Sequence, residues 1–207
     1  PEVIPTLKYE DFLKYHEEYY HPSNSYIYIY GDMDVNERLE YLDREYLSDF
    51  DVSDVDIHAN IERQAAFDKP VYETKPYAIT EDESLEDNTY LSYNAVIGTS
   101  VDAKLYLAFQ ILDYALVMTP GAPVKQALLD AGISTDVYSS YETSLYQPVY
   151  SIVAKNSNSK EQDRFVSVIN DTLEKLVKDG INERTIEAGI NYYEFKYREA
   201  DYGPYPK

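Results

Sequence analysis

Apolar residues recur at the spacing of an α-helix along several stretches of this 207-residue chain. In the longest of them, Gly180 ends a predicted helix whose buried stripe has six members: Phe165, Val168, Ile169, Leu173, Leu176 and Val177. Asp34 and Glu37 open another stretch with a capping pattern. The spacing predicts helices over residues 9–20, 34–47, 102–118, 124–131 and 159–179, and a last one from 182 onward.

Other stretches have the short, β-branched and aromatic character of strands, namely residues 25–31, 89–98, 133–143 and 149–154. The first of these, SYIYIYG, carries bulky residues at every position from Tyr26 to Tyr30. Because both of its faces are bulky, we expect a central strand that is covered on both sides. Residues 69–79 look extended but contain two prolines, which places them near a sheet edge.

From residue 69 onward the predicted strands and helices come in pairs, in the order ββααββαα. Paired rather than alternating elements indicate an α+β fold with an antiparallel-rich sheet and helices packed on one side. Residues 51–68 are polar and acidic, and we interpret them as a linker between residues 1–50 and residues 69–207.

The composition narrows the classes of partner and chemistry. There is no cysteine, which excludes disulfides, thiolate metal sites and cysteine nucleophiles, and fits a reducing compartment such as the cytoplasm. The net charge of −20 makes nucleic acid and anionic membrane surfaces poor partners. Solubility explains this acidity most simply, and an attraction for basic peptides is the alternative. The most apolar run, residues 105–118, is shorter than the ~20 residues that span a bilayer, so no membrane span is predicted.

The candidate metal-binding stretch is HEEYYHPSN, which contains His16 and His21. Five residues along a helix correspond to a rotation of about 140°, so the two imidazoles point to different sides and miss the zinc-binding spacing. The acidic run from Asp49 to Asp56 lacks the glycine and the final glutamate of a calcium-binding loop. The chain also lacks phosphate-binding glycine loops and GxSxG. We therefore predict no catalytic, cofactor-binding or metal-binding residue in this chain.

Three segments nevertheless carry a specific resemblance. Residues 1–34 read PEVIPTLKYEDFLKYHEEYYHPSNSYIYIYGDMD, residues 119–134 read TPGAPVKQALLDAGIS, and residues 197–207 read YREADYGPYPK. They resemble the insulinase/pitrilysin-type zinc metallopeptidases, or inverzincins, in their presequence-protease branch. Lys8, Val124 and Ser134 depart from the family's pattern, and Lys8 does so where a hydroxyl residue usually caps a helix.

The resemblance implies where the chemistry lies. The family binds zinc through HxxEH and a later glutamate, and these match positions upstream of Pro1, whereas its substrate-binding Arg and Tyr match positions downstream of Lys207. His16 and His21 match non-ligand histidines of the family. The resemblance thus implies that residues 1–50 end a first peptidase-like domain. Residues 69–207 then form most of a second, non-catalytic one that is incomplete at its C-terminus.

The full-length parent is then expected to bind zinc, to enclose unfolded peptide substrates in a closed chamber and to supply the remaining domains as partners of this chain. Two other classes stay open: a catalytically dead structural subunit of the same fold, and a free-standing peptide-binding module. The isolated chain is expected to be inactive and to self-associate through apolar surface around Tyr26–Tyr30.

Overall fold

The computed structural model describes residues 3–51 and 62–199. The chain divides into two compact units, Pro1–Glu62 and Arg63–Lys207. We call them unit 1 and unit 2 and describe each by itself.

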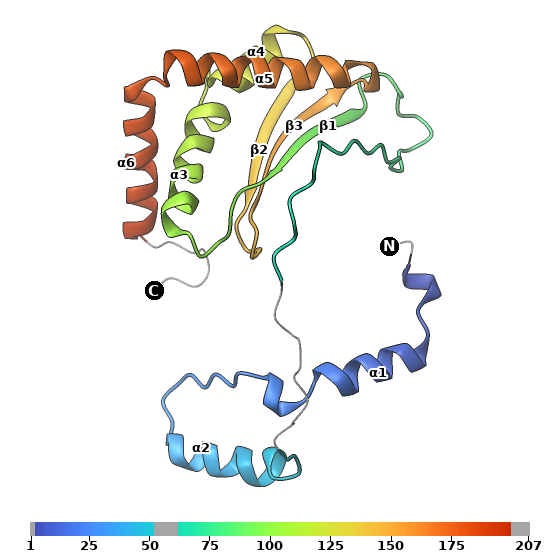
Figure 1. Ribbon diagram of the computed structural model, residues 1–207, viewed down its shortest axis with the longest axis vertical. Coiled ribbons are helices and arrows are strands. Elements are labelled where there is room, and N and C mark those ends of the chain that lie inside the picture. Colours follow the sequence, from blue (N-terminus) through green and yellow to red (C-terminus); the bar gives the residue numbers. More distant parts are fainter. Residues whose placement is uncertain (1–2, 52–61, 200–207) are drawn as a thin grey trace. The chain divides into compact units, whose positions relative to one another are not determined.

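Unit 1 consists of short helical elements joined by extended segments (Figure 1). They are the 3₁₀ turn Ile4–Thr6, α1 (Tyr9–Tyr19), the 3₁₀ turn Pro22–Asn24, α2 (Val35–Leu42) and a π-helical turn, Asp43–Leu47. Both helices predicted for this part are confirmed. The Asp34 carboxylate begins α2 by accepting hydrogen bonds from two backbone N–H groups. Lys8 occupies the N-cap of α1 without a side-chain hydrogen bond, as its departure from the family pattern suggested.

The strand predicted for residues 25–31 is not formed. These residues make no backbone ladder, and Tyr26, Tyr28 and Tyr30 have exposed fractions of 104%, 86% and 86%. A strand needs neighbouring strands to supply its hydrogen bonds, and the part of unit 1 that the structure describes contains none. No described side chain of unit 1 is buried. The residue types thus favour a strand for which this unit lacks the partners.

Unit 2 contains a small sheet and the remaining helices (Figure 1). Its strands are β1 (Thr89–Val96), β2 (Asp136–Glu142) and β3 (Val149–Ser157). Its helices are α3 (Ala103–Asp113), which continues as a π-helical turn (Tyr114–Met118), α4 (Pro123–Asp130), α5 (Gln162–Asp179) after a 3₁₀ turn (Ser159–Glu161), and α6 (Glu183–Glu199). These elements confirm the helices predicted for this part and its strands from residue 89 onward.

The three strands are antiparallel in the order β1-β3-β2. Burial alternates along β3, where Tyr150, Ile152 and Ala154 are buried while the residues between them are partly exposed. Helices α3, α4 and α5 contact the sheet or one another on that buried side, and α6 packs against α3. The predicted α+β fold, an antiparallel sheet with helices on one side, is confirmed.

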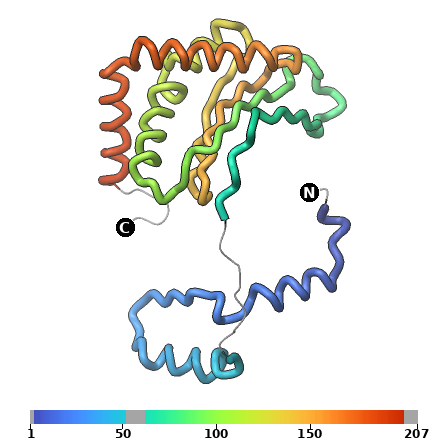
Figure 2. Tube along the Cα trace, viewed as in Figure 1, coloured from blue at the N-terminus to red at the C-terminus, as the bar shows by residue number. Residues whose placement is uncertain are grey.

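Residues 69–79 form no strand and have no other regular secondary structure. The predicted order ββααββαα is therefore wrong at its first strand, and the observed order begins with β1. Two prolines in this segment remove backbone donors that a ladder would need. Figure 2 follows this part of the chain to the start of β1.

One cluster of apolar side chains forms the core of unit 2. Its fully buried members include Val124 and Leu128 of α4, Ile152 of β3, and Phe165 and Ile169 of α5. Burial of these side chains is the main stabilising contribution to the unit.

Helix α6 packs closely against α3 at Gly189. A Cβ atom on Gly189 would lie 3.1 Å from Tyr114 Cδ1 and 3.3 Å from Ile111 Cγ2. Glycine weakens a helix interior, so its presence here is explained by the room it leaves between α6 and α3.

The helical run Ala103–Asp130 is long and apolar enough, by length and composition, to cross a membrane. The turn at Thr119–Ala122 interrupts it, and Val117, Val124 and Leu128 from this run lie in the core of unit 2. Core helices of globular proteins share this length and composition, so we interpret the run as core.

Candidate functional site

The two histidines of the HEEYYH stretch each contact a different aromatic side chain. The His16 ring stacks on Tyr20 at a centroid distance of 4.7 Å. The His21 ring meets the edge of Phe50 at 5.5 Å, and its Nδ1 accepts a hydrogen bond from the backbone N–H of Ser23. The two imidazoles are therefore engaged in different local contacts at the end of α1.

No group of three or more His, Asp or Glu side chains that could hold a metal ion occurs within residues 3–51 and 62–199. His58 and most of the acidic run Asp49–Asp56, including Asp54 and Asp56, lie outside the described residues. The described residues therefore do not fit a zinc ion, and the absence of site residues from the whole chain stays a prediction.

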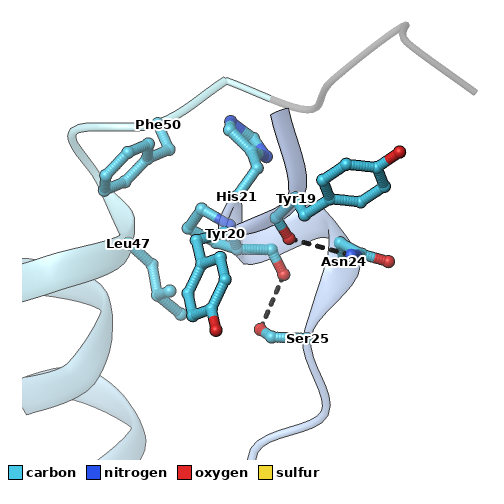
Figure 3. A pocket seen from close by; sticks show the side chains of 8 residues that line it. Tyr19, Tyr20, His21, Asn24, Ser25, Leu47 and Phe50 are labelled. Atoms are coloured by element: carbon cyan, nitrogen blue, oxygen red, sulfur yellow. Dashed lines mark hydrogen bonds between the residues drawn. The ribbon is translucent and has the colours of Figure 1, made fainter. Parts of the chain in front are cut away.

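The HPSN residues instead build the turn that ends α1 (Figure 3). His21 caps the 3₁₀ turn Pro22–Asn24, and Pro22 occupies its first position, where a missing N–H costs nothing. Asn24 Nδ2 donates to the backbone oxygen of Tyr19 at 2.9 Å, and Ser25 Oγ donates to that of Pro22 at 2.8 Å. The side chains of His21, Asn24 and Ser25 thus satisfy backbone groups of the turn or of the helix end.

A shallow pocket of about 520 Å³ lies beside this turn (Figure 3). Its lining is mostly aromatic and aliphatic, from the end of α1, the turn itself and the segment after α2: Tyr19, Tyr20, His21, Pro22, Asn24, Ser25, Leu47 and Phe50. The pocket is lined by no carboxylate and by no activated nucleophile. It suits an apolar side chain better than a reacting substrate.

The most distinctive polar group of unit 2 is a buried pair between α3 and β3. Tyr150 Oη donates a hydrogen bond of 2.9 Å to Asp113 Oδ1, and the exposed fraction of Asp113 is only 6%. The Ser139 hydroxyl adjoins the pair, and its Oγ has no hydrogen bond of normal geometry among the described residues. A single carboxyl group is thus enclosed by the core with one firm partner.

Burial governs the protonation of this pair. It raises the pKa of Asp113 above its ordinary value, and the hydrogen bond from Tyr150 counteracts part of that effect. Burial, followed by the nearby Asp113 charge, raises the pKa of Tyr150. The same two causes raise the pKa of Tyr193 on α6 to about 12.

Perturbed carboxyl groups are common in active sites, but this one lies inside the core where a substrate cannot reach it. We therefore interpret the pair as a structural link between α3 and the sheet. The sequence carried one signal for it, since Asp113 is the charged residue inside the apolar run 105–118. Nothing in the sequence identified Tyr150 as its partner.

Comparison with known proteins identifies relatives over the whole chain. The family described as "Peptidase M16 inactive domain" matches residues 6–193. Protein HypA from Clostridium perfringens is 42% identical over 206 residues, which cover all of this chain and 21% of that protein. Presequence protease 1, chloroplastic/mitochondrial, from Arabidopsis thaliana is 34% identical over 209 residues, covering all of this chain and 19% of that protein.

The chain therefore spans about a fifth of the length of these curated relatives. A solved inactive peptidase domain from Bordetella parapertussis aligns at a TM-score of 0.49 and 14% identity, over 56% of this chain and 62% of that one. A likeness this remote carries no weight for the function of the chain.

Proposed function

This chain belongs to the family of the peptidase M16 inactive domain, and on that premise we propose that it is a non-catalytic part of a longer zinc-dependent oligopeptidase of the presequence-protease type. The observation that carries the proposal is the family match over residues 6–193, joined to relatives named as presequence proteases. In the proposed parent, the chain helps to enclose unfolded peptides, while zinc and its ligands belong to another part of the polypeptide.

The proposal assigns residues 1–50 to the end of a first peptidase-like domain, residues 51–68 to a linker and residues 69–207 to the second, non-catalytic domain. Two observations support this division. The boundary between the compact units falls between Glu62 and Arg63, inside the proposed linker. The described residues of unit 1 bury no side chain, which suits a segment whose core comes from elsewhere.

The remaining domains of the same polypeptide are the proposed partners. The exposed strand-like residues Tyr26–Tyr30 are the surface we assign to that contact, since their bulky faces need cover on both sides. We propose the cytoplasm as the compartment for this chain, whereas the names of several relatives place those proteins in mitochondria or chloroplasts.

The first test measures metal and activity in the purified chain. We expect no stoichiometric zinc by equilibrium dialysis and no cleavage of an unfolded peptide, because the described residues offer no set of ligands for the metal. Tight binding of one zinc ion per chain would overturn the assignment as a non-catalytic part. A dialysed sample of a zinc-binding protein of similar size serves as the positive control.

The second test concerns self-association. We expect sedimentation of the chain alone to show oligomers whose population rises with concentration, since the contiguous bulky side chains from Tyr26 to Tyr30 face water. The triple variant Tyr26→Ser, Tyr28→Ser, Tyr30→Ser should shift the population toward monomer. The matched control Tyr9→Ser, Tyr72→Ser, Tyr138→Ser removes three exposed tyrosines elsewhere and should leave the population unchanged. A wild-type chain that stays monomeric at all concentrations contradicts this expectation.

The third test asks whether the chain is completed by another part of such a peptidase. We would co-express it with the portion of the Clostridium perfringens relative that precedes the matched region, and purify by a tag on that portion. We expect a one-to-one complex, lost in the Tyr26/Tyr28/Tyr30 variant and kept in the control variant. If neither wild type nor control co-purifies while both remain folded, a free-standing module becomes the better explanation.

A further inference from the structure

Residues 63–80, which we call the connector, form the first part of unit 2 and have no regular secondary structure. All described side chains from Glu62 to Pro70 are exposed, so burial does not hold the first part of the connector in place. Its position must come from polar contacts. Two such contacts tie it to the sheet, one near each end.

The contact near the beginning is made by the side-chain amide of Gln147. Gln147 Oε1 accepts a hydrogen bond from the backbone N–H of Gln64 at 2.6 Å, and Gln147 Nε2 donates one to the backbone oxygen of Gln64 at 3.2 Å. A primary amide carries an acceptor and a donor in one plane, as a peptide group does. Gln147 thus pairs with Gln64 as a residue of a neighbouring strand would.

The backbone on either side of Gln147 is itself held. Gln147 lies in the connection between β2 and β3, where the Tyr146 oxygen accepts from the Ser100 N–H at 2.9 Å. The Pro148 oxygen accepts from the Ile97 N–H at 2.8 Å. These bonds fix the two residues that flank Gln147, so its side chain extends from an ordered base.

The contact near the far end involves Tyr77. Its hydroxyl bonds to the backbone oxygen and the side-chain Oδ1 of Asn88, just before β1, and its ring meets Tyr90 edge-on at 5.7 Å. Between Gln64 and Tyr77, the described residues make no backbone hydrogen bond to a strand. Gln147 is therefore the one polar tie to the sheet that the structure describes for the first part of the connector.

We propose that Gln147 is a positioning residue that captures the main chain at Gln64 and so fixes the connector against the β2–β3 connection of unit 2. Because both bonds go to backbone atoms, the capture depends on the residue at position 147 and not on the side chain at position 64. Loss of the amide leaves the connector free from residue 63 to the Tyr77 contact, while the core of unit 2 stays intact.

The rate of tryptic cleavage at Arg63–Gln64 measures whether Gln147 holds the backbone of Gln64. Lys69 and Lys75 are both followed by proline, before which trypsin does not cut, so Arg63–Gln64 is the one tryptic bond between residues 62 and 88. A protease must bind an extended backbone, and in the wild type the N–H and oxygen of Gln64 are occupied. We expect Gln147→Ala to be cut at this bond about 5–30 times faster than wild type, as the loss of two exposed hydrogen bonds allows.

The controls separate capture from general stability. Gln126→Ala removes another glutamine, whose amide bonds to Asp130 within α4, and should leave the rate at Arg63–Gln64 unchanged. Gln147→Glu keeps an acceptor for the Gln64 N–H but loses the donor, and should give an intermediate rate. An unchanged rate in Gln147→Ala, or an equal increase at every tryptic bond of unit 2, would overturn the proposal.

Discussion

Replacing Phe165 by alanine is expected to lower the free energy of unfolding by about 3–5 kcal/mol, the range for deleting a buried phenylalanine ring. Phe165 lies in the first part of α5 with an exposed fraction of 1%, and it belongs to the same buried cluster as Leu128 and Ile152. The loss combines the transfer of the ring to water with the cavity it leaves between helix and sheet. Urea unfolding followed by circular dichroism measures it.

The same helix supplies the control. Val177 has an exposed fraction of 88%, so Val177→Ala removes almost no buried area. We expect its free energy of unfolding to stay within about 0.5 kcal/mol of wild type, as for other surface substitutions. If both variants lost similar amounts, α5 would not be held by its buried face, and the packing described for unit 2 would be wrong.

The second large effect is expected at Asp113, where two substitutions should act in opposite directions. Asp113→Ala leaves the buried Tyr150 hydroxyl without its acceptor and should cost about 1–3 kcal/mol. Asp113→Asn keeps an oxygen for that hydroxyl but carries no charge to bury, so it should unfold at higher urea concentration than wild type at neutral pH. Asp171→Asn, at an exposed site on α5, is the matched control and should change little.

The stability difference between Asp113→Asn and wild type should depend on pH, and the direction follows from the pKa shift of Asp113. The pKa of Asp113 is raised in the folded protein, so the folded state holds the proton more tightly than the unfolded one. The resulting stabilisation is fully present below the ordinary carboxyl pKa of about 3.9 and is lost as the pH rises through the folded value. The advantage of Asp113→Asn over wild type should therefore shrink as the pH is lowered toward 4. An advantage that grew on acidification would show that the charged form is the one that the fold favours.

The sequence predicted those elements that depend only on the periodicity of nearby residues. The apolar stripe predicted α5 correctly, and two of its members, Phe165 and Ile169, are buried. Its last member, Val177, is exposed, because its position is rotated away from the buried face around the helix axis. Residues 25–31 show the limit of such reasoning, because their composition predicts a strand and a strand exists only with neighbours. Residues 69–79 show a second limit, since a strand-like composition with two prolines joins no ladder.

The contacts of the site could be predicted only in part. The spacing of His16 and His21 already spoke against a shared metal, and the structure gives each a separate neighbour. The pairing of Asp113 with Tyr150 joins residues 37 positions apart, and that of Gln147 with Gln64 joins residues 83 apart. No periodicity encodes such pairs, because they depend on how the hairpin and helices pack.

The π-helical turn Tyr114–Met118 limits the insertions and deletions that this protein can accept. The turn is closed by a hydrogen bond from the Thr119 N–H to the Tyr114 oxygen, five residues back, and it places Ala115, Leu116 and Val117 in the core. Loss of one codon here would restore an ordinary helix and turn every later residue by about 100° around the axis. Leu116 and Val117 would then turn away from the core. The chain would also enter α4 from a different side of the α3 axis. Descendants of this gene should therefore accept substitutions in this turn more readily than insertions or deletions.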